Sequence, residues 1–253
     1  MSIDQNQLLT AFDSVLQPER FKDYGPNGLQ VQGKKHISHL VSGVTASLAL
    51  IEAAVAAKAD AILVHHGLFW RGHDGRVTGW LKQRLALLLR HDINLYAYHL
   101  PLDAHPVWGN NAQLGLKLGL VAQRSFGEQN LGLLGESADG VGFANLSALS
   151  QHIQQVLGRT VLAVGESERP IRQVAWCSGG AQSYFEAAIE AGADVFITGE
   201  ISEPQAHYAR ETGVAFVACG HHASERYGAP ALGAEVARQC HIGHQFIDID
   251  NPA

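Results

Sequence analysis

Histidine is the residue type that points most directly to chemistry in this chain. The sequence contains 14 histidines against 18 lysines and arginines, and imidazole is the commonest metal ligand among protein side chains. A fold that gathers several of these rings with carboxylates would form a cation site. The side chains whose positions fit such a site are His65, His66, His99, Asp103, Glu200, His221 and Glu225.

The adjacent pair His65 and His66 follows the short apolar run 61–64. Neighbouring residues within a strand point to opposite faces, so both imidazoles can converge only where the strand has ended. Gly67 supplies such a break. An isolated histidine pair is more often one buried ring and one exposed ring, and this alternative stays open when the pair is considered alone.

His221 and Glu225 are separated by four residues. If a helical turn begins after Gly220, this spacing puts an imidazole and a carboxylate on one face, as in a chelating pair. The alternative is an ordinary pair on a helix surface. Neither reading depends on thiolate chemistry, because the three cysteines form no CxxC pair.

Asp103 lies four residues after His99. Pro101 stands between them and would deny a continuing strand its ladder hydrogen bond, which predicts a loop here. A carboxylate in a loop usually faces water. However, three separate strand ends that supply His-His, Asp and His-x-x-x-Glu would be an odd coincidence without a cation.

The ligand types are mutually consistent. Three neutral imidazoles and two carboxylates suit divalent first-row ions such as iron, zinc, manganese, cobalt or nickel. Five side chains are too many for one catalytic ion that keeps an open position, but they fit two ions about 3.5–4 Å apart. The residues therefore predict a dinuclear centre with two divalent metal ions per chain.

The elements that must position these side chains alternate between helix and strand. Strands are expected at 39–44, 61–64 and 93–98, with helices at 46–58 and 80–90. Short, fully apolar runs between helices are typical of parallel sheets buried on both faces. In open α/β sheets ligands bind beyond the carboxyl ends of the strands, which is where the candidate ligands stand.

The second half of the chain repeats this pattern. The segment 52–60 (EAAVAAKAD) aligns with 186–194 (EAAIEAGAD), and the strand that follows it, 61–64, aligns with 195–198. A later helix and strand, 203–212 and 214–218, match 80–90 and 93–97. We therefore predict an α/β fold with two similar modules related by internal duplication, comprising residues 1–125 and 126–253.

Charge and hydropathy exclude several classes of partner. The net charge of −6 provides no diffuse positive field for a phosphate backbone, so nucleic acid is an unlikely partner. The longest apolar stretch, 46–64, is interrupted by Glu52, Lys58 and Asp60, so no membrane span is expected. The N-terminal residues 1–16 have the pattern of an amphipathic helix rather than a signal peptide. These features predict a cytoplasmic protein.

Five sequence motifs resemble those of one known family, the NIF-three-like proteins, which are often labelled GTP cyclohydrolase 1 type 2 homologues. The likeness extends over essentially the whole chain, with the motifs in the same order. The motifs are 27–33 (NGLQVQG), 65–70 (HHGLFW), 98–103 (YHLPLD), 192–200 (GADVFITGE) and 220–225 (GHHASE).

The resemblance implies a dinuclear metal site between two α/β modules, at the carboxyl ends of their strands, and a toroidal homohexamer. It implies that His99 lies close to the metals, as a further ligand or as a proton-transfer group. Glu200 stands where relatives have aspartate, and we expect it to contact a metal-binding side chain rather than to bind a metal itself. The metal ligands that the resemblance implies are His65, His66, Asp103, His221 and Glu225, with Glu225 as the bridge.

Two hypotheses for function follow. The first is a metal-dependent hydrolase acting on a phosphorylated or nucleotide-like small molecule, with His99 as the catalytic residue that shuttles a proton. The alternative is a non-catalytic metal-binding or metal-delivery ring protein that uses the same ligands. GTP cyclohydrolase activity itself is not expected, because Cys177 and Cys219 are not at ligand spacing for a zinc-thiolate site.

Overall fold

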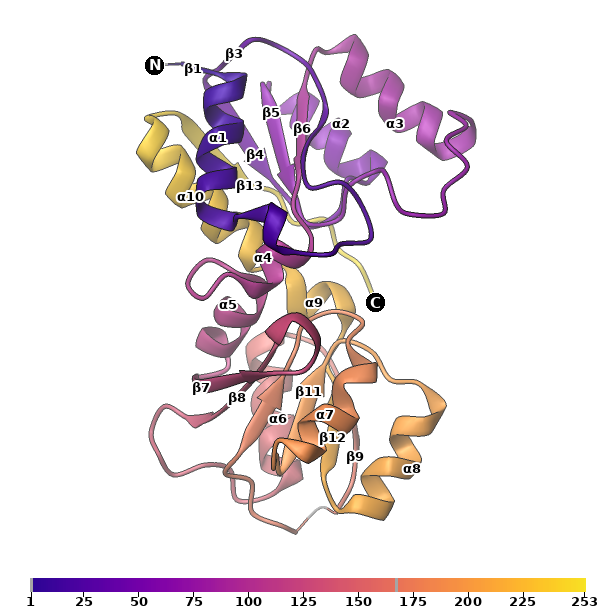
Figure 1. Cartoon of the computed structure of the whole chain (residues 1–253), viewed down its shortest axis with the longest axis vertical. Helices are drawn as coiled ribbons and strands as arrows, with labels where there is room; N and C mark the ends of the chain where they lie inside the picture. Colours follow the sequence, from indigo (N-terminus) through magenta and orange to yellow (C-terminus); the bar gives the residue numbers. More distant parts are fainter. Residues whose placement is uncertain (1, 167) are drawn as a thin grey trace. The chain divides into compact units, whose positions relative to one another are not determined.

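The computed structural model describes residues 2–166 and 168–253, which form two compact units (Figure 1). The first unit contains the chain up to Gly109 and then Gly228–Asp250, and the second contains Asn110–Tyr227 and Asn251–Ala253. This division differs from a single boundary near residue 125, because helix α10 (Gly228–Cys240) and strand β13 (Gly243–Phe246) return to the first unit. There β13 pairs in parallel with β4 (His39–Ser42).

The first unit is built on a five-stranded sheet in the order β13-β4-β5-β6-β2. Strands β4, β5 (Ala61–Val64) and β6 (Asn94–Ala97) are parallel, and β2 (Gly28–Val31) is antiparallel at one edge. All four residues of β5 are buried. This is expected for a central parallel strand with helices on both faces.

Two apolar clusters cover the two faces of this sheet. Along β5, Ile62 and Val64 belong to one cluster whereas Ala61 and Leu63 belong to the other, as the alternation of side chains in a strand requires. Helices α2 (Leu48–Ala56) and α3 (Gly79–Arg90) pack in the first cluster, and α1 (Gln5–Leu16) and α10 in the second. Figure 1 shows α10 beside α1, although they are far apart in sequence.

The second unit contains a six-stranded sheet in the order β7-β8-β10-β11-β12-β9. Its core is again parallel, with β10 (Val174–Trp176), β11 (Val195–Thr198) and β12 (Ala215–Ala218) adjacent. The remaining strands are β7 (Leu120–Phe126), β8 (Gly132–Ser137) and β9 (Leu162–Val164). The α-helices of this unit are α5 (Asn110–Lys117), α6 (Leu146–Leu157), α7 (Phe185–Glu190), α8 (Glu203–Thr212) and α9 (His221–Glu225).

The repeat predicted from sequence is visible in the hydrogen bonds at the start of the sheets. In the first unit, one oxygen of Asp60 accepts from the backbone N–H groups of Ser38 (2.9 Å) and His39 (3.1 Å). In the second unit, Asp194 accepts from the equivalent residues, Arg172 and Gln173 (both 2.9 Å). The prediction of two similar α/β modules is therefore confirmed.

Two short helices follow equivalent strands. The segment after β6 was expected to be a loop, but it forms α4 (Leu100–Ala104). The loop prediction is wrong because Pro101 lies in the first turn, where a helix does not need its N–H. The turn expected after Gly220 is confirmed as α9. Among the described residues, no helix is long and apolar enough to cross a membrane.

Candidate metal centre

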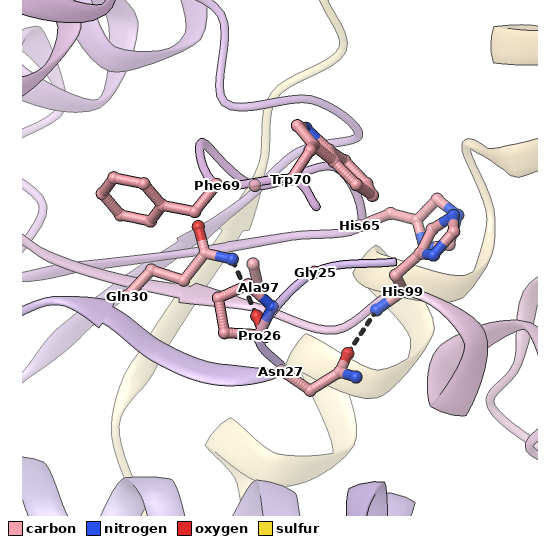
Figure 2. Close-up of a pocket in the computed structure, with 10 residues that line it drawn as sticks. Gly25, Pro26, Asn27, Gln30, His65, Phe69, Trp70, Ala97 and His99 are labelled. Carbon is pink, nitrogen blue, oxygen red and sulfur yellow. Dashed lines mark hydrogen bonds between the residues drawn. The ribbon is translucent and has the colours of Figure 1, made fainter. Parts of the chain in front are cut away.

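Three histidines of the first unit form a cluster at the carboxyl ends of two neighbouring strands. His65 and His66 follow β5, and His99 follows β6. The ring centroid of His65 lies 4.5 Å from that of His66 and 4.9 Å from that of His99, and Figure 2 shows the rings of His65 and His99 side by side. Each histidine offers one ring nitrogen to a group of atoms that lie within 4.8 Å of one another.

Hydrogen bonds fix the orientation of the two adjacent rings. Nδ1 of the fully buried His65 donates to the backbone oxygen of Tyr98 (3.0 Å). Nδ1 of His66 forms a hydrogen bond with the hydroxyl of Thr45 (3.0 Å). Partners of this kind at one ring nitrogen set the tautomer and the orientation of metal-binding histidines. In both rings Nε2 is therefore the nitrogen suited to bind a metal.

A buried carboxylate holds the third ring. Oδ1 of Asp23 lies 2.7 Å from Nδ1 of His99, while Oδ2 accepts from the backbone N–H of Leu100 and from the side chain of Asn27 (both 2.9 Å). The oxygen of Asn27 accepts from the backbone N–H of His99 (2.8 Å; Figure 2). Burial alone would raise the pKa of Asp23, but the hydrogen bonds from His99 and Asn27 outweigh burial and lower this pKa below its usual value. Asp23 is therefore an ionised acceptor that orients His99.

Asp103 joins this group from α4. It is 7% exposed, and its Oδ1 lies 3.5 Å from Nε2 of His65. Two ligands of a tetrahedral zinc-like ion, each bound at 2.0–2.1 Å, lie about 3.4 Å apart. The helical turn at 100–104, which replaces the expected loop, thus delivers the carboxylate to the ring nitrogen rather than to water.

Aromatic side chains enclose the histidine cluster on one side. The ring of Trp70 lies 5.1 Å from that of His99 and 6.0 Å from that of His66, measured between centroids. A small cavity of about 10 Å³, lined by Trp70, Phe69 and Gln30 among others, reaches His65 and His99 (Figure 2). A cavity of this size holds roughly one water molecule.

The second unit contains its own group of candidate ligands. His221 and Glu225 face the same side of α9, with Nε2 of His221 3.1 Å from Oε2 of Glu225. Nδ1 of His221 lies 2.6 Å from Oε1 of Glu200. Burial would lower the pKa of His221, but the hydrogen bonds and charges of Glu225 and Glu200 outweigh it and raise this pKa to about 9. The site therefore favours positive charge at this position.

Close packing against a glycine fixes the carboxylate of Glu225, which is 3% exposed. A Cβ atom added to Gly179 would lie 1.9 Å from Oε1 of Glu225, and Gly179 has a φ of +69°. The backbone approach to the carboxylate thus requires glycine.

Comparison with known proteins agrees with this fold and with these motifs. The family model described as Duf34/NIF3 (NGG1p interacting factor 3) matches residues 3–252. The chain belongs to the Duf34/NIF3 family. A protein of Neisseria meningitidis serogroup A named "GTP cyclohydrolase 1 type 2 homolog" is 52% identical over 249 residues, which cover 98% of this chain and 99% of that protein. A protein of the same name from Pseudomonas aeruginosa is 48% identical over the full length of both chains.

Solved structures of this family share the whole fold. A protein described as "protein ybgI, unknown function" superposes with a TM-score of 0.94 at 44% identity and covers 99% of this chain and 100% of its own. A structure from Thermus thermophilus gives a TM-score of 0.89 at 30% identity, with the same coverage. The family resemblance seen in the motifs is therefore confirmed.

Within this Duf34/NIF3 chain, the residues expected to act together fall into two groups. The first unit brings together His65, His66, His99 and Asp103, and the second brings together His221, Glu225 and Glu200. Both groups have the composition of divalent-metal sites, and metal binding by the named ligands stays a prediction. Glu200 contacts His221, which is the position expected of a residue that orients a ligand.

Sequence reasoning missed the residues that hold the histidines. Thr45 and Asp23 lie far from the ligand motifs in sequence, and single threonine or aspartate residues carry no distinctive pattern. For Asp23 a weak signal exists, since the turn at 24–27 (YGPN) follows it directly. A conformationally restricted turn next to an acidic residue can hold that residue close to the end of a strand.

Proposed function

We propose that this Duf34/NIF3 chain binds two divalent metal ions and uses them to hydrolyse a phosphorylated or nucleotide-like small molecule. The observation that carries the proposal is the way the histidines are held. His65, His66, His99 and His221 each have Nδ1 engaged by an oxygen atom. Histidines that serve only in packing do not need this common arrangement, whereas metal ligands do.

The proposed ligands are His65, His66 and Asp103 in the first unit and His221 and Glu225 in the second. Imidazole and carboxylate together suit iron, zinc, manganese or nickel, and the absence of cysteine from either group disfavours soft ions. Bound divalent ions would supply Lewis acidity and an activated water near neutral pH. The side chains present therefore fit the cofactor that the family resemblance implies.

His99 is proposed to transfer a proton. Its Nδ1 is held by the ionised Asp23 at 2.7 Å, an arrangement that fixes the tautomer and the orientation of the ring, as in other catalytic carboxylate–histidine pairs. The side chain of His99 is 21% exposed, so it is reachable from solvent while its partner is buried. General acid–base groups contribute about 10²- to 10⁴-fold to rate.

The test uses protein purified without a metal-affinity tag and loaded with iron, zinc, manganese or nickel in turn. A panel of phosphate esters and nucleotides is screened for hydrolysis, and each activity found is repeated after chelation. We expect activity to vanish in the metal-free protein and to return on reloading. Full activity in protein shown by elemental analysis to be metal-free would contradict the proposal.

The variant His99→Gln separates the two roles left open for this residue. A proton-transfer role predicts an unchanged metal content with turnover reduced at least about 100-fold. If His99→Gln loses metal instead, His99 is a ligand. His91→Gln is a suitable control because His91 is exposed at the end of α3 and belongs to neither ligand group, and it should change neither quantity.

The second candidate function is metal delivery without catalysis. The observation in its favour is the 29% exposure of the His221 side chain, which would ease exchange with an acceptor. Transfer of the bound metal to a chelating acceptor within minutes, with no turnover of any ester in the panel, would support delivery over hydrolysis.

Assembly and location belong to the same proposal. From the family resemblance we propose a toroidal homohexamer, for which sedimentation should give about six times the 27.2 kDa chain mass. We also propose that the protein is cytoplasmic, since Cys219 is a buried cysteine outside any disulfide, of the kind that a reducing compartment preserves.

A further inference from the structure

We propose that Arg159 binds the phosphate group of a nucleoside monophosphate, or of a similar phosphorylated molecule, in an open pocket of the second unit. The inference rests on the proposed function and deepens it, because it names how the substrate is recognised. The pocket has a volume of about 450 Å³, within the range of about 300–1,000 Å³ found for small-molecule sites. Its lining includes Arg159, Thr160, Gly199, Glu200 and Gly220.

Two backbone oxygens hold the guanidinium of Arg159 in place. Nη1 donates to the oxygen of Ala253 (2.9 Å), and Nε makes a longer contact with the oxygen of Thr160 (3.4 Å). Within the described residues, the other guanidinium N–H groups donate to no protein acceptor. Arginine presents five donors in a planar fork that matches phosphate oxygens. Arg159 is therefore a partly fixed cation with donors available on the pocket wall.

The backbone at Gly220 lies very close to the guanidinium of Arg159. A Cβ atom added to Gly220 would lie 2.0 Å from Nη1 of Arg159, and Gly220 has a φ of +100°. Any other residue at this position would push the guanidinium away and strain the backbone. Because Gly220 directly precedes His221, the cation lies against the strand end that carries a proposed metal ligand.

The pocket also contains a negatively charged side chain, that of Glu200. Glu200 also lines the pocket, and its carboxylate accepts from Nδ1 of His221. The side chain of Glu200 is 46% exposed, so its oxygens can accept further hydrogen bonds from hydroxyl or amino groups. A ligand with an anionic end for Arg159 and hydrogen-bond donors for Glu200 matches this arrangement. Phosphorylated nucleosides have both features.

Arg159 and a neighbouring backbone N–H group already bind an oxygen atom of the chain in this pocket. The oxygen of Ala253 accepts from Nη1 of Arg159 and from the backbone N–H of His222 (3.2 Å). Two convergent donors, one of them charged, therefore satisfy an oxygen at this position. A phosphate oxygen can accept the same type of hydrogen bond from Arg159, and a phosphate group can in addition accept two parallel N–H···O bonds from the planar guanidinium.

The experiment measures binding of AMP and adenosine to metal-loaded protein by isothermal titration calorimetry. We expect AMP to bind at least tenfold more tightly than adenosine. In Arg159→Gln this preference should disappear while metal content and melting temperature stay at the wild-type values, and Arg159→Lys should keep part of it. Arg169→Gln is the matched control, because Arg169 also donates to a backbone oxygen of this unit, that of Gly213, and it should leave the preference intact.

Two results would overturn the inference. One is an equal preference for AMP over adenosine in wild type and in Arg159→Gln, which would mean that the metals or other residues hold the phosphate. The other is no preference for AMP in the wild-type protein. Metal content measured on the same samples keeps the two proposals apart, since full metal occupancy in either case would leave the metal-binding proposal standing.

Discussion

The buried pair of Asp23 and His99 shows how single residues prepare this site. The carboxylate of Asp23 accepts four hydrogen bonds, of which one fixes the ring of His99 and another the first turn of α4. In Asp23→Asn one of the two accepting oxygens becomes an NH2 group. If the amide oxygen accepts from Leu100 and Asn27, the NH2 group faces Nδ1 of His99, so His99 should lose its fixed tautomer. Nitrogen NMR of the histidine rings should show this change for His99 alone. Asp92→Asn, at an exposed turn, is the control and should show none.

A contrary result for Asp23 is equally clear. If His99 keeps the same tautomer in Asp23→Asn, the carboxylate is not what orients the ring. Activity found in the ester screen should then also be unchanged, whereas our account expects it to fall at least about tenfold, because hydrogen bonds to charged groups contribute about 1.5–3 kcal/mol.

The close contact of Gly179 with Glu225 gives a second prediction at the residue scale. Gly179→Ala would force the carboxylate of Glu225 away, because the new Cβ would lie 1.9 Å from it. Metal content should fall. Gly192→Ala is the control, since Gly192 also has a positive φ (+81°) but no atom within 4 Å of an added Cβ. Both variants should lose about 1 kcal/mol of stability from backbone strain, and only the first should lose metal.

The ligand residues were predictable from sequence because each follows an apolar strand, and strand ends converge at one edge of a parallel sheet. Their partners were not predictable. Thr45 and Asp23 contact histidines that are 21 and 76 residues away in sequence. Apart from the turn that follows Asp23, no local pattern in the chain indicates these pairs. The pocket around Arg159 was missed for the same reason. Ala253, whose oxygen accepts a hydrogen bond from Arg159, is 94 residues away from it in sequence.

At the scale of elements, a carboxylate fixes the start of the first sheet. Asp60 accepts from Lys34 (2.7 Å) as well as from Ser38 and His39. Burial alone would raise the pKa of Asp60, but the hydrogen bonds from Lys34 and Ser38 outweigh it and lower this pKa from 3.8 to about 2. Because the folded-state pKa is depressed, the stabilisation is present above about pH 4 and is lost as the pH falls towards 2.

This pH dependence can be measured by urea unfolding of wild type and Asp60→Asn between pH 5 and pH 2. The wild type should lose about 2 kcal/mol more than Asp60→Asn over this range, because the variant has no carboxylate to protonate. Losses that come from other groups are common to both proteins and cancel. Parallel curves for the two proteins would show that Asp60 does not contribute in this way.

Local patterns predicted several elements well and one poorly. Strands β5 and β11 and helix α8 coincide with their expected ranges, because each is a regular run bounded by turn or capping residues. Helix α4 was missed because Pro101 is compatible both with a loop and with a first helical turn. Only the contacts of the folded chain decide between the two.

At the scale of the whole molecule, the duplication was visible in sequence but the division into compact units was not. Strand β13 (GHQF) has an exposed and polar pattern, so its parallel pairing with β4, which lies far earlier in the chain, left no local signal. The two units each contain their own apolar core and their own group of candidate ligands.

The most direct test of the central claim is the metal content per chain, measured by elemental analysis on protein purified without a metal-affinity tag. The account predicts about two equivalents of a divalent metal in the wild type, and their loss in the double variant His65→Ala, Glu225→Ala. The matched double variant His91→Ala, Glu235→Ala changes the same residue types outside both ligand groups and should keep the metal. Wild-type protein that binds no metal even after reconstitution would contradict the account, because the histidines would then be purely structural.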